Sequence, residues 1–139
     1  MKIKFLRFNE KAKIPERKHY SDTGADVYLL EDLILPPHSV QGIDLGFGIE
    51  VPNGYNAHLQ VRTSIAKKGV FIQQCAIDAG YKGELHMIIV NLTPETKTFK
   101  EGERLGYIEV YPCVYPDFVD DLGEERGDGW NGSTNKGDK

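Results

Sequence analysis

The sequence predicts an all-β domain in the form of a sandwich, a jelly roll or a small barrel. Three observations support this prediction. Apolar side chains recur at a spacing of two residues in several short segments, which is the periodicity of a β-strand. Gly, Pro, Asn and Asp interrupt these segments at fairly regular intervals, as they do between the strands of sandwiches and barrels. No segment carries the sustained i, i+3, i+4, i+7 apolar stripe of an amphipathic helix.

Four strands are predicted in the first half of the chain, over residues 3–8, 33–35, 41–51 and 55–61. Pro36-Pro37 ends the second strand or places it at a sheet edge, because proline cannot donate to a strand ladder. Apolar residues stand at every second position from Ile43 to Val51, so we expect one unbroken strand there. The turn residues 52–54 separate it from the next strand, where the alternation resumes.

The second half of the chain continues the same pattern. Residues 84–92 are rich in β-branched side chains, and Thr93-Pro94 closes this predicted strand. A polar turn then leads into a strand over residues 105–110. The only candidate helix is one or two turns around residues 64–68. We therefore expect a single β domain over residues 1–121, with no internal repeat.

Residues 122–139 form a predicted tail of different composition. This segment is rich in glycine and charge, and Trp130 is its only large apolar residue after Leu122. Such a composition cannot build a core, so we expect the tail to be flexible in the free protein. Its glycines leave backbone N–H groups able to approach an anion closely. Two interpretations remain open: a solvated tail with a stray aromatic, or a segment that closes over a phosphate ligand.

Charge and hydropathy exclude several classes of protein. The chain has 17 basic and 21 acidic residues and a net charge of -4, whereas general nucleic-acid binding shows as a clustered basic excess. The longest apolar run, residues 87–90, is far below the roughly 18 residues of a membrane-spanning helix. The N-terminal residues lack the hydrophobic stretch of a secretory signal, so the expected location is the cytoplasm.

The two cysteines, Cys75 and Cys113, are far apart in the sequence and have apolar neighbours. Neither belongs to a CxxC pair or to a Cys/His spacing typical of a metal site. Free cysteine behaves as a small apolar residue and is commonly buried. We therefore predict two buried free thiols.

Three polar clusters lie at strand ends or turns. The segment DTGAD (22–26) places two carboxylates around a glycine, and RTS (62–64) places a guanidinium beside two hydroxyls at the end of a strand. The segment IDAGYKG (77–83) places an acid and an aromatic three residues apart in a glycine-containing turn. Each cluster alone also fits a structural role, such as capping a turn, pairing a buried charge or packing. Their order along the chain is more informative.

These clusters belong to five segments that resemble, in order, the five motifs of the trimeric dUTPase family. TGADV resembles A-G-x-D-(L/V), RTSIA resembles R-(S/T)-(S/G)-x-(A/S), and CAIDAGYKGE resembles G-V-I-D-x-x-Y-x-G. GERLG resembles G-(D/E)-R-(I/L)-A-Q, and RGDGWNGST resembles R-G-x-G-G-F-G-S-T-G. The resemblance covers nearly the whole chain. It implies a jelly-roll-like subunit, a homotrimer whose active sites are shared between chains, and hydrolysis of dUTP to dUMP and pyrophosphate with Mg²⁺.

The resemblance also implies roles for the third cluster. Asp78 would be the catalytic residue that orients and activates water for in-line attack at the α-phosphorus, and it would hold the 3′-hydroxyl. Tyr81 would pack under the deoxyribose and exclude a 2′-hydroxyl, which rejects UTP. The hairpin after Asp78, with Lys82 and Gly83, would bind uracil through backbone groups and leave no space for the thymine methyl.

Other implied residues hold the triphosphate and the metal. The implied phosphate-binding residues are Arg62, Thr63, Ser64, Arg126, Gly132, Ser133 and Thr134. The last four would reach the β- and γ-phosphates from a neighbouring subunit, and Trp130 would form an aromatic lid on the base. Asp26 would hold Arg62 or bind Mg²⁺ through water, together with the substrate phosphates.

The chain departs from the family motifs at several positions. Cys75-Ala76 stand where Gly-Val is usual, and Tyr107 replaces the glutamine of the fourth motif, which removes one phosphate contact. Thr63 takes the first serine position of the second motif and keeps the hydroxyl. Asn131 takes the aromatic position of the fifth motif, so stacking there depends on the preceding Trp130.

Three alternatives to a dUTPase were considered. A dCTP deaminase shares the fold and parts of the second and third motifs, but it needs a catalytic Glu and lacks the C-terminal Arg-Gly…Gly-Ser-Thr segment. A dUTPase-like protein could instead act mainly as a regulatory binding partner, alone or in addition to catalysis. A β module without a ligand would leave the tail unexplained. The joint presence of Asp78, Tyr81, Arg62 and Arg126 favours an active enzyme.

Overall fold

The computed structural model describes residues 1–123, so most of the predicted tail lies outside the described residues. The strands are β1 (Lys4–Arg7), β2 (Ala25–Val27), β3 (Leu33–Leu35), β4 (Ser39–Asp44), β5 (Phe47–Glu50), β6 (Tyr55–Val61), β7 (Val70–Ile72), β8 (Cys75–Ile77), β9 (His86–Asn91), β10 (Lys97–Phe99) and β11 (Gly106–Pro112). One short helix, α1 (Thr63–Ala66), lies between β6 and β7. The predicted all-β class is confirmed. Within residues 1–123, no helix is long and apolar enough to cross a membrane.

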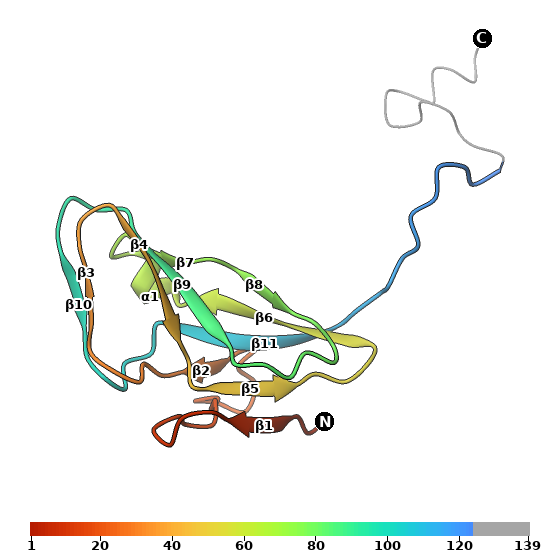
Figure 1. Ribbon diagram of the computed structural model, residues 1–139, viewed down its shortest axis with the longest axis horizontal. Coiled ribbons are helices and arrows are strands. Elements are labelled where there is room, and N and C mark those ends of the chain that lie inside the picture. Colours follow the sequence, from red (N-terminus) through yellow and green to blue (C-terminus); the bar gives the residue numbers. More distant parts are fainter. Residues whose placement is uncertain (124–139) are drawn as a thin grey trace, which may run out of the picture.

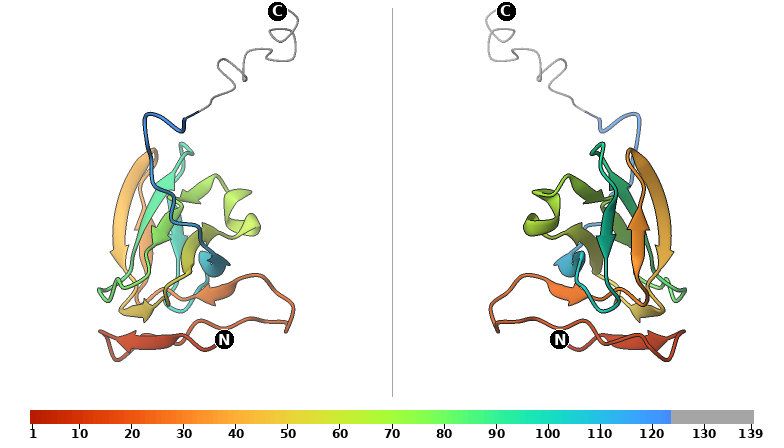
Figure 2. Two further views of the ribbon diagram at one scale, coloured as in Figure 1. Left: turned by 90° about the vertical axis from the view of Figure 1, so that its right-hand side faces the viewer. Right: turned by 90° about the vertical axis from the view of Figure 1, so that its left-hand side faces the viewer.

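Two larger antiparallel sheets form the layers of a sandwich (Figures 1 and 2). One has the strand order β2-β11-β6-β8, and the other has the order β4-β9-β7. The layers approach closely at Gly106 of β11, where a Cβ atom would lie 2.8 Å from Ile72 Cδ1 and 3.3 Å from Met87 Cε of the other sheet. The pairs β1-β5 and β3-β10 extend the sandwich at its ends. Among the described strands the sheets do not close into a barrel.

The core lies between the two layers and follows the alternation seen in the sequence. On β6, Ala57 and Leu59 are buried, while Asn56, His58 and Gln60 alternate with them and are half-buried on the opposite face. On β9, Met87, Ile89 and Asn91 are buried. Burying an apolar side chain of the size of leucine, isoleucine or methionine stabilises the folded state by about 1.5–3 kcal/mol. The spacing of two therefore identifies the inner face of β6 and β9.

The prediction of one unbroken strand over residues 41–51 is wrong. β4 ends at Asp44, β5 begins at Phe47, and the two strands belong to different sheets. Gly46 makes the corner with φ +76, and a Cβ atom there would lie 2.8 Å from Leu30 Cδ1. Only glycine adopts this conformation readily in so little space. Leu45 and Phe47 are buried on either side of the corner, so the alternation continues although the strand does not.

The prediction of two buried thiols is also wrong. Cys75 is exposed and Cys113 is only partly buried, although both are free as expected. Cys75 lies on β8, which is the edge strand of its sheet, and Cys113 comes directly after β11, where the chain leaves the sheet. On β8 only Ile77 is buried, whereas Cys75 and its neighbour Ala76 are exposed. Val114, which follows Cys113, is also exposed.

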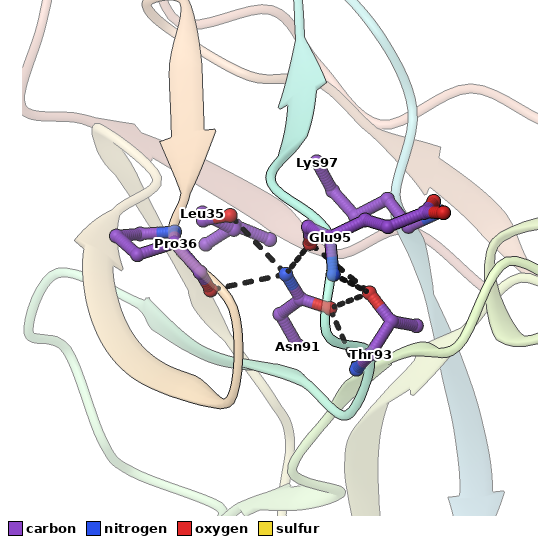
Figure 3. Close-up of polar contacts among 6 residues, drawn as sticks. All are labelled: Leu35, Pro36, Asn91, Thr93, Glu95 and Lys97. Carbon is purple, nitrogen blue, oxygen red and sulfur yellow. Dashed lines mark hydrogen bonds and ion pairs between the residues drawn. The ribbon is translucent and has the colours of Figure 1, made fainter.

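Asn91 joins two turns at one end of the sandwich (Figure 3). Its Nδ2 donates to the carbonyl oxygens of Leu35, Pro36 and Glu95 at 3.1, 3.0 and 2.8 Å. Its Oδ1 accepts from the amide and the hydroxyl of Thr93 at 3.0 and 2.8 Å. Because the side chain is fully buried, these bonds satisfy its amide group, which water does not reach.

We expect Asn91→Leu to lower the free energy of unfolding by about 3 kcal/mol, because buried carbonyl groups lose their donor. Urea denaturation followed by circular dichroism measures this loss. Gln41→Leu on the exposed side of β4 is the matched control and should change the free energy by less than about 0.5 kcal/mol. Equal stability of the two variants would show that the Asn91 network is not stabilising.

After β11 the chain runs away from both sheets (Figure 1). We call residues 114–123 the C-terminal arm. The arm contacts the domain near its start, where the Gly54 amide donates to the Tyr115 hydroxyl at 2.9 Å. Beyond that point it presents large apolar side chains to solvent, with Phe118 at 94% and Leu122 at 83% exposure. These apolar side chains of the arm are therefore not buried against the domain.

Candidate active site

A cavity of about 340 Å³ opens between β8 and β9, and we call it the hairpin cavity. β7 pairs with β9 up to Ile72, and the Gln73 amide donates to the Ile88 carbonyl at 2.9 Å. Beyond this point the two chain segments diverge, because β8 pairs with β6 while β9 pairs with β4. The cavity fills the gap between them. Its wall is largely apolar but includes both Asp78 and Tyr81.

The loop after β8 fixes Tyr81 at this cavity. The Tyr81 amide donates to the Asp78 carbonyl at 3.2 Å, and the Tyr81 hydroxyl donates to the Glu84 carbonyl at 3.0 Å. The ring lies so close to Gly83 that a Cβ atom there would be 2.3 Å from the phenolic oxygen. Gly83 therefore makes room for Tyr81. Neither Gly83 nor Lys82 lines the cavity, and Lys82 Nζ instead lies 3.9 Å from Glu50 Oε1.

A second cavity of about 290 Å³ lies at the far end of the four-stranded sheet, and we call it the Arg62 cavity. Its lining residues are Asp22, Thr23, Gly24, Asp26, Arg62, Thr63 and Tyr107. Asp26 comes from β2 and Tyr107 from β11, and the two stand opposite each other in the ladder. Arg62 follows β6, and Thr63 begins α1. The structure thus brings Asp26, Arg62 and Thr63 together in one lining, whereas Ser64 is exposed on α1 outside it.

Charged contacts organise the Arg62 cavity. Arg104 Nη1 donates to Asp26 Oδ2 at 2.8 Å, and Arg62 Nε lies 4.0 Å from Asp26 Oδ1. Arg62 Nη1 donates to the Arg104 carbonyl at 2.9 Å. Arg104 is not among the site residues predicted from the sequence. The available signal was its position in the segment GERLG, where Arg104 stands at the arginine of the fourth motif.

Tyr107 forms a wall of the same cavity. Its ring lies against Gly24, where a Cβ atom would be 2.0 Å from Tyr107 Cδ2, so Gly24 is the residue that accommodates the ring. The phenol therefore occupies the place where the fourth motif has an amide. Close by, the pKa of Tyr28 is raised by burial and by the carboxylates of Glu16 and Asp26. Tyr28 thus stays neutral at pH 7. The charged side chains that line the cavity are Asp22, Asp26 and Arg62, and Arg104 contacts Asp26 from outside the lining.

The two cavities lie at opposite ends of β6. Ile77 pairs with Ala57 near the start of the strand, so Asp78 lies level with Asn56. Arg62 directly follows Val61, the last residue of the strand, and lies six positions beyond Asn56. At about 3.3 Å per residue this separates Asp78 from Arg62 by about 20 Å. A single subunit therefore does not bring Asp78 and Tyr81 together with Asp26, Arg62 and Thr63.

A half-buried polar face joins the two cavities along β6 and β11. Glu109 is only 6% exposed, and it accepts a hydrogen bond from Gln60 Nε2 at 2.7 Å. A hydrogen bond to Glu109 raises the pKa of Tyr111, with burial as a smaller cause. His58 stands opposite Glu109 in the ladder and packs on the Tyr111 ring with 5.7 Å between centroids.

The remaining predicted site residues lie in the tail. Arg126, Trp130, Gly132, Ser133 and Thr134 are outside the described residues. Among residues 1–123, no group of three or more His, Cys, Asp or Glu side chains is arranged to hold a metal ion.

The family model for dUTPase matches residues 10–135 of the chain. The chain belongs to the dUTPase family. Two similar relatives are the deoxyuridine 5′-triphosphate nucleotidohydrolases of Ehrlichia canis (strain Jake) and Clostridium tetani (strain Massachusetts / E88), each 34% identical. The Ehrlichia alignment covers 95% of this chain and 94% of the relative, and the Clostridium alignment covers 98% and 97%. The recognition made from the five motifs is confirmed.

Solved dUTPase structures share the fold. The dUTPase of Staphylococcus bacteriophage 80alpha, solved with dUpNHpp, superposes with a TM-score of 0.82 at 22% identity and covers 89% of this chain and 90% of its own. A variant dUTPase of phage phi11 of S. aureus, whose structure reveals the coordination of a structural Mg(II) ion, superposes with a TM-score of 0.80 at 24% identity. The match covers 88% of this chain and 99% of the phage protein. At these identities the likeness supports the predicted dUTPase-like sandwich and carries no residue role.

Proposed function

We propose that this dUTPase-family chain is a dUTP diphosphatase, which hydrolyses dUTP to dUMP and pyrophosphate by in-line attack of water at the α-phosphorus. The observation that carries the proposal is the hairpin cavity, where Asp78 and Tyr81 share the wall of an apolar hollow. Relatives named for this activity match the chain over nearly its whole length. The cytoplasmic location expected from the sequence belongs to the same proposal.

The hairpin cavity suits a uracil base. Its size lies in the range of about 300–1,000 Å³ that small-molecule sites occupy. Beyond Gln73 and Ile88, the facing edges of β8 and β9 no longer pair with each other. Backbone N–H and C=O groups on these edges need partners. A uracil, with one donor between two acceptors, can bridge them, and we propose that the walls of the same cavity exclude the thymine methyl.

Tyr81 is proposed as the wall that excludes a ribose 2′-hydroxyl. Its ring is held by the Glu84 carbonyl and needs the space at Gly83. Tyr81→Ala should therefore lower the ratio of kcat/KM for dUTP to that for UTP by about 10-fold or more, and weaken dUTP binding as well. Steady-state kinetics with both nucleotides gives the ratio. Tyr81→Phe keeps the ring and serves as the control, and equal ratios for wild type and Tyr81→Ala would assign Tyr81 to packing alone.

The Arg62 cavity is proposed to hold the triphosphate. A guanidinium offers forked donors to phosphate oxygens, and Thr63 and Ser64 add hydroxyls. In our proposal the tail residues Arg126, Gly132, Ser133 and Thr134 bind the β- and γ-phosphates, and Trp130 covers the base. Tyr107 replaces an amide contact of the family motif with a phenol at the same wall.

The donor set of the Arg62 cavity also fits Mg²⁺. Mg²⁺ prefers oxygen ligands, keeps several waters, and is usually bound through one or two carboxylates together with substrate phosphates. Asp22 and Asp26 supply carboxylates here, and Asp26 Oδ1 lies 4.0 Å from Arg62 Nε, which leaves it able to accept from a metal-bound water. The ion would neutralise phosphate charge and orient the leaving pyrophosphate.

A homotrimer with shared active sites completes the proposal. The separation of about 20 Å between Asp78 and Arg62 is too large for both residues to act on one α-phosphate from a single subunit. The half-buried polar face and the apolar C-terminal arm are both surfaces that a second copy of the chain can cover. We therefore propose that the hairpin cavity of one subunit meets the Arg62 cavity of the next.

A pyrophosphate-release assay tests the proposal directly. We expect release from dUTP and little from dCTP, dTTP or UTP, and only when Mg²⁺ is present. Ammonia release from dCTP would instead support the dCTP deaminase alternative. A folded protein with no activity on any of the four nucleotides would favour a role as a binding partner. The relatives' names favour the dUTPase outcome.

A further inference from the structure

We infer that Arg104 is a positioning residue, which holds Asp26 and Arg62 in the arrangement that receives the triphosphate and its metal ion. The inference rests on the proposed function and assigns a residue that acts from behind the Arg62 cavity. Arg104 is not among the residues that line the cavity, whereas Asp26 and Arg62 both are. Its effect must therefore pass through these two neighbours.

The sheet order places Arg104 between its two partners. Arg104 comes two residues before β11, which lies between β2 and β6 in the four-stranded sheet. Asp26 is on β2, and Arg62 follows β6. The Arg104 side chain reaches one neighbour, with 2.8 Å from Nη1 to Asp26 Oδ2. The carbonyl oxygen of Arg104 accepts a hydrogen bond from the other partner, with 2.9 Å to Arg62 Nη1.

Arg104, and not Arg62, fixes the orientation of the Asp26 carboxylate. The 2.8 Å contact is a charge-assisted hydrogen bond, whereas 4.0 Å between Arg62 Nε and Asp26 Oδ1 is too long for one. The Asp26 side chain is only 17% exposed, so this bond is better shielded from solvent than an ordinary surface ion pair. One carboxylate oxygen is thus taken by Arg104, and the other remains available at the cavity.

Arg62 is held in a complementary way. Its Nη1 is bound to a neutral carbonyl oxygen, and its backbone amide donates to the Leu105 carbonyl at 3.0 Å. A neutral acceptor orients the guanidinium without cancelling its charge, so the other N–H donors keep full attraction for an anion. If the Arg104 side chain were removed, Arg62 would be the nearest cation for Asp26. A tight Asp26–Arg62 pair would then compete with phosphate for Arg62 and with metal-bound water for Asp26.

This competition predicts the kinetic effect of Arg104→Met. We expect kcat/KM for dUTP to fall by about 10- to 100-fold, the size of effect that displaced substrate-positioning groups produce. The Mg²⁺ concentration that gives half-maximal rate should rise, because Asp26 is drawn away. Binding of deoxyuridine, which has no phosphate and uses only the hairpin cavity, should not change. Arg104→Lys keeps a cation near Asp26 and should recover part of the lost activity.

Arg7→Met is the matched control for loss of a structural arginine. Arg7 lies on β1, and its guanidinium donates to the carbonyl oxygens of Glu10 and Ala12, away from both cavities. Thermal unfolding of both variants gives their stabilities. Arg7→Met should lose stability with little change in kcat/KM or in the Mg²⁺ requirement. If it lowered activity as much as Arg104→Met does, the inference would be overturned.

A double-mutant cycle with Asp26→Asn decides the route of the effect. If Arg104 acts through Asp26, adding Arg104→Met to Asp26→Asn should lower kcat/KM by less than about 3-fold beyond the single change. If the two changes instead lowered kcat/KM by independent factors that multiply in the double variant, the inference would be overturned. Such a result would indicate a direct contact between Arg104 and phosphate. Wild-type protein that releases no pyrophosphate from dUTP would instead remove the proposed function, and this inference with it. The two failures are therefore distinguishable.

Discussion

Asp78→Asn is expected to lower kcat for dUTP hydrolysis by about two to four orders of magnitude, which is the usual contribution of a general base. The amide keeps the shape of the carboxylate but cannot take a proton from the attacking water. Asp78 lines the hairpin cavity and also borders a neighbouring hollow with Asn56 and Tyr115, so there is space beside it for water and for a sugar hydroxyl. Pyrophosphate release measures the rate.

Nucleotide binding separates loss of the base from loss of the site. A non-hydrolysable dUTP analogue with Mg²⁺ should bind the variant within about 10-fold of wild type by calorimetry, since the amide still hydrogen-bonds the 3′-hydroxyl. Asp32→Asn is a suitable control, because Asp32 is exposed and pairs with Lys100 outside the hairpin cavity. A variant Asp78→Asn that turns over dUTP at the parent rate would remove Asp78 from the mechanism.

The long strands could be predicted because local pattern and burial agree there. β6 runs over the predicted residues 55–61, and β9 lies within the predicted residues 84–92. The short helix also lies where the sequence indicated one. In these elements one face is buried, so a spacing of two is required by the structure and visible in the sequence. The three-residue strands β7, β8 and β10 are too short to show a period.

The corner at Gly46 shows where this kind of prediction fails. At Gly46 the chain passes from the sheet of β4 to the two-stranded β1-β5 pair, and it can keep pointing alternate side chains into the same core. Leu45 and Phe47 do so on either side of the turn. Periodicity is then unbroken although the hydrogen-bond ladder changes partner. The prediction that Cys75 is buried was wrong for a related reason, since the sequence does not show which strand lies at the edge of a sheet.

The candidate site could be predicted by residue but not by arrangement. The motifs supplied Asp78 and Tyr81 for one cavity and Asp26 and Arg62 for the other. Their separation along β6 depends on strand register, which no motif encodes. The role of Arg104 depends on β11 lying between β2 and β6, and this order exists only in the folded sheet.

Mixing two inactive variants is expected to restore activity if active sites are shared between subunits. Asp78→Asn disables every hairpin cavity, and Arg62→Gln disables every Arg62 cavity. When the two chains are unfolded together in equal amounts and refolded, some sites will combine an intact hairpin cavity with an intact Arg62 cavity from a neighbour. Random association in a cyclic trimer makes about one quarter of the sites complete, so about one quarter of wild-type activity should return.

The matched control is a mixture whose two defects lie in the same cavity. Asp26 and Arg62 both line the Arg62 cavity, so no mixture of Asp26→Asn with Arg62→Gln contains an intact copy of it. That mixture should show only the mean of the two separate activities. Size-exclusion chromatography with light scattering checks that each variant and each mixture assembles as the wild type does. Absence of restored activity in well-assembled mixtures of Asp78→Asn with Arg62→Gln would mean that each subunit closes its own site. The distance of about 20 Å along β6 would then have to be bridged within one chain.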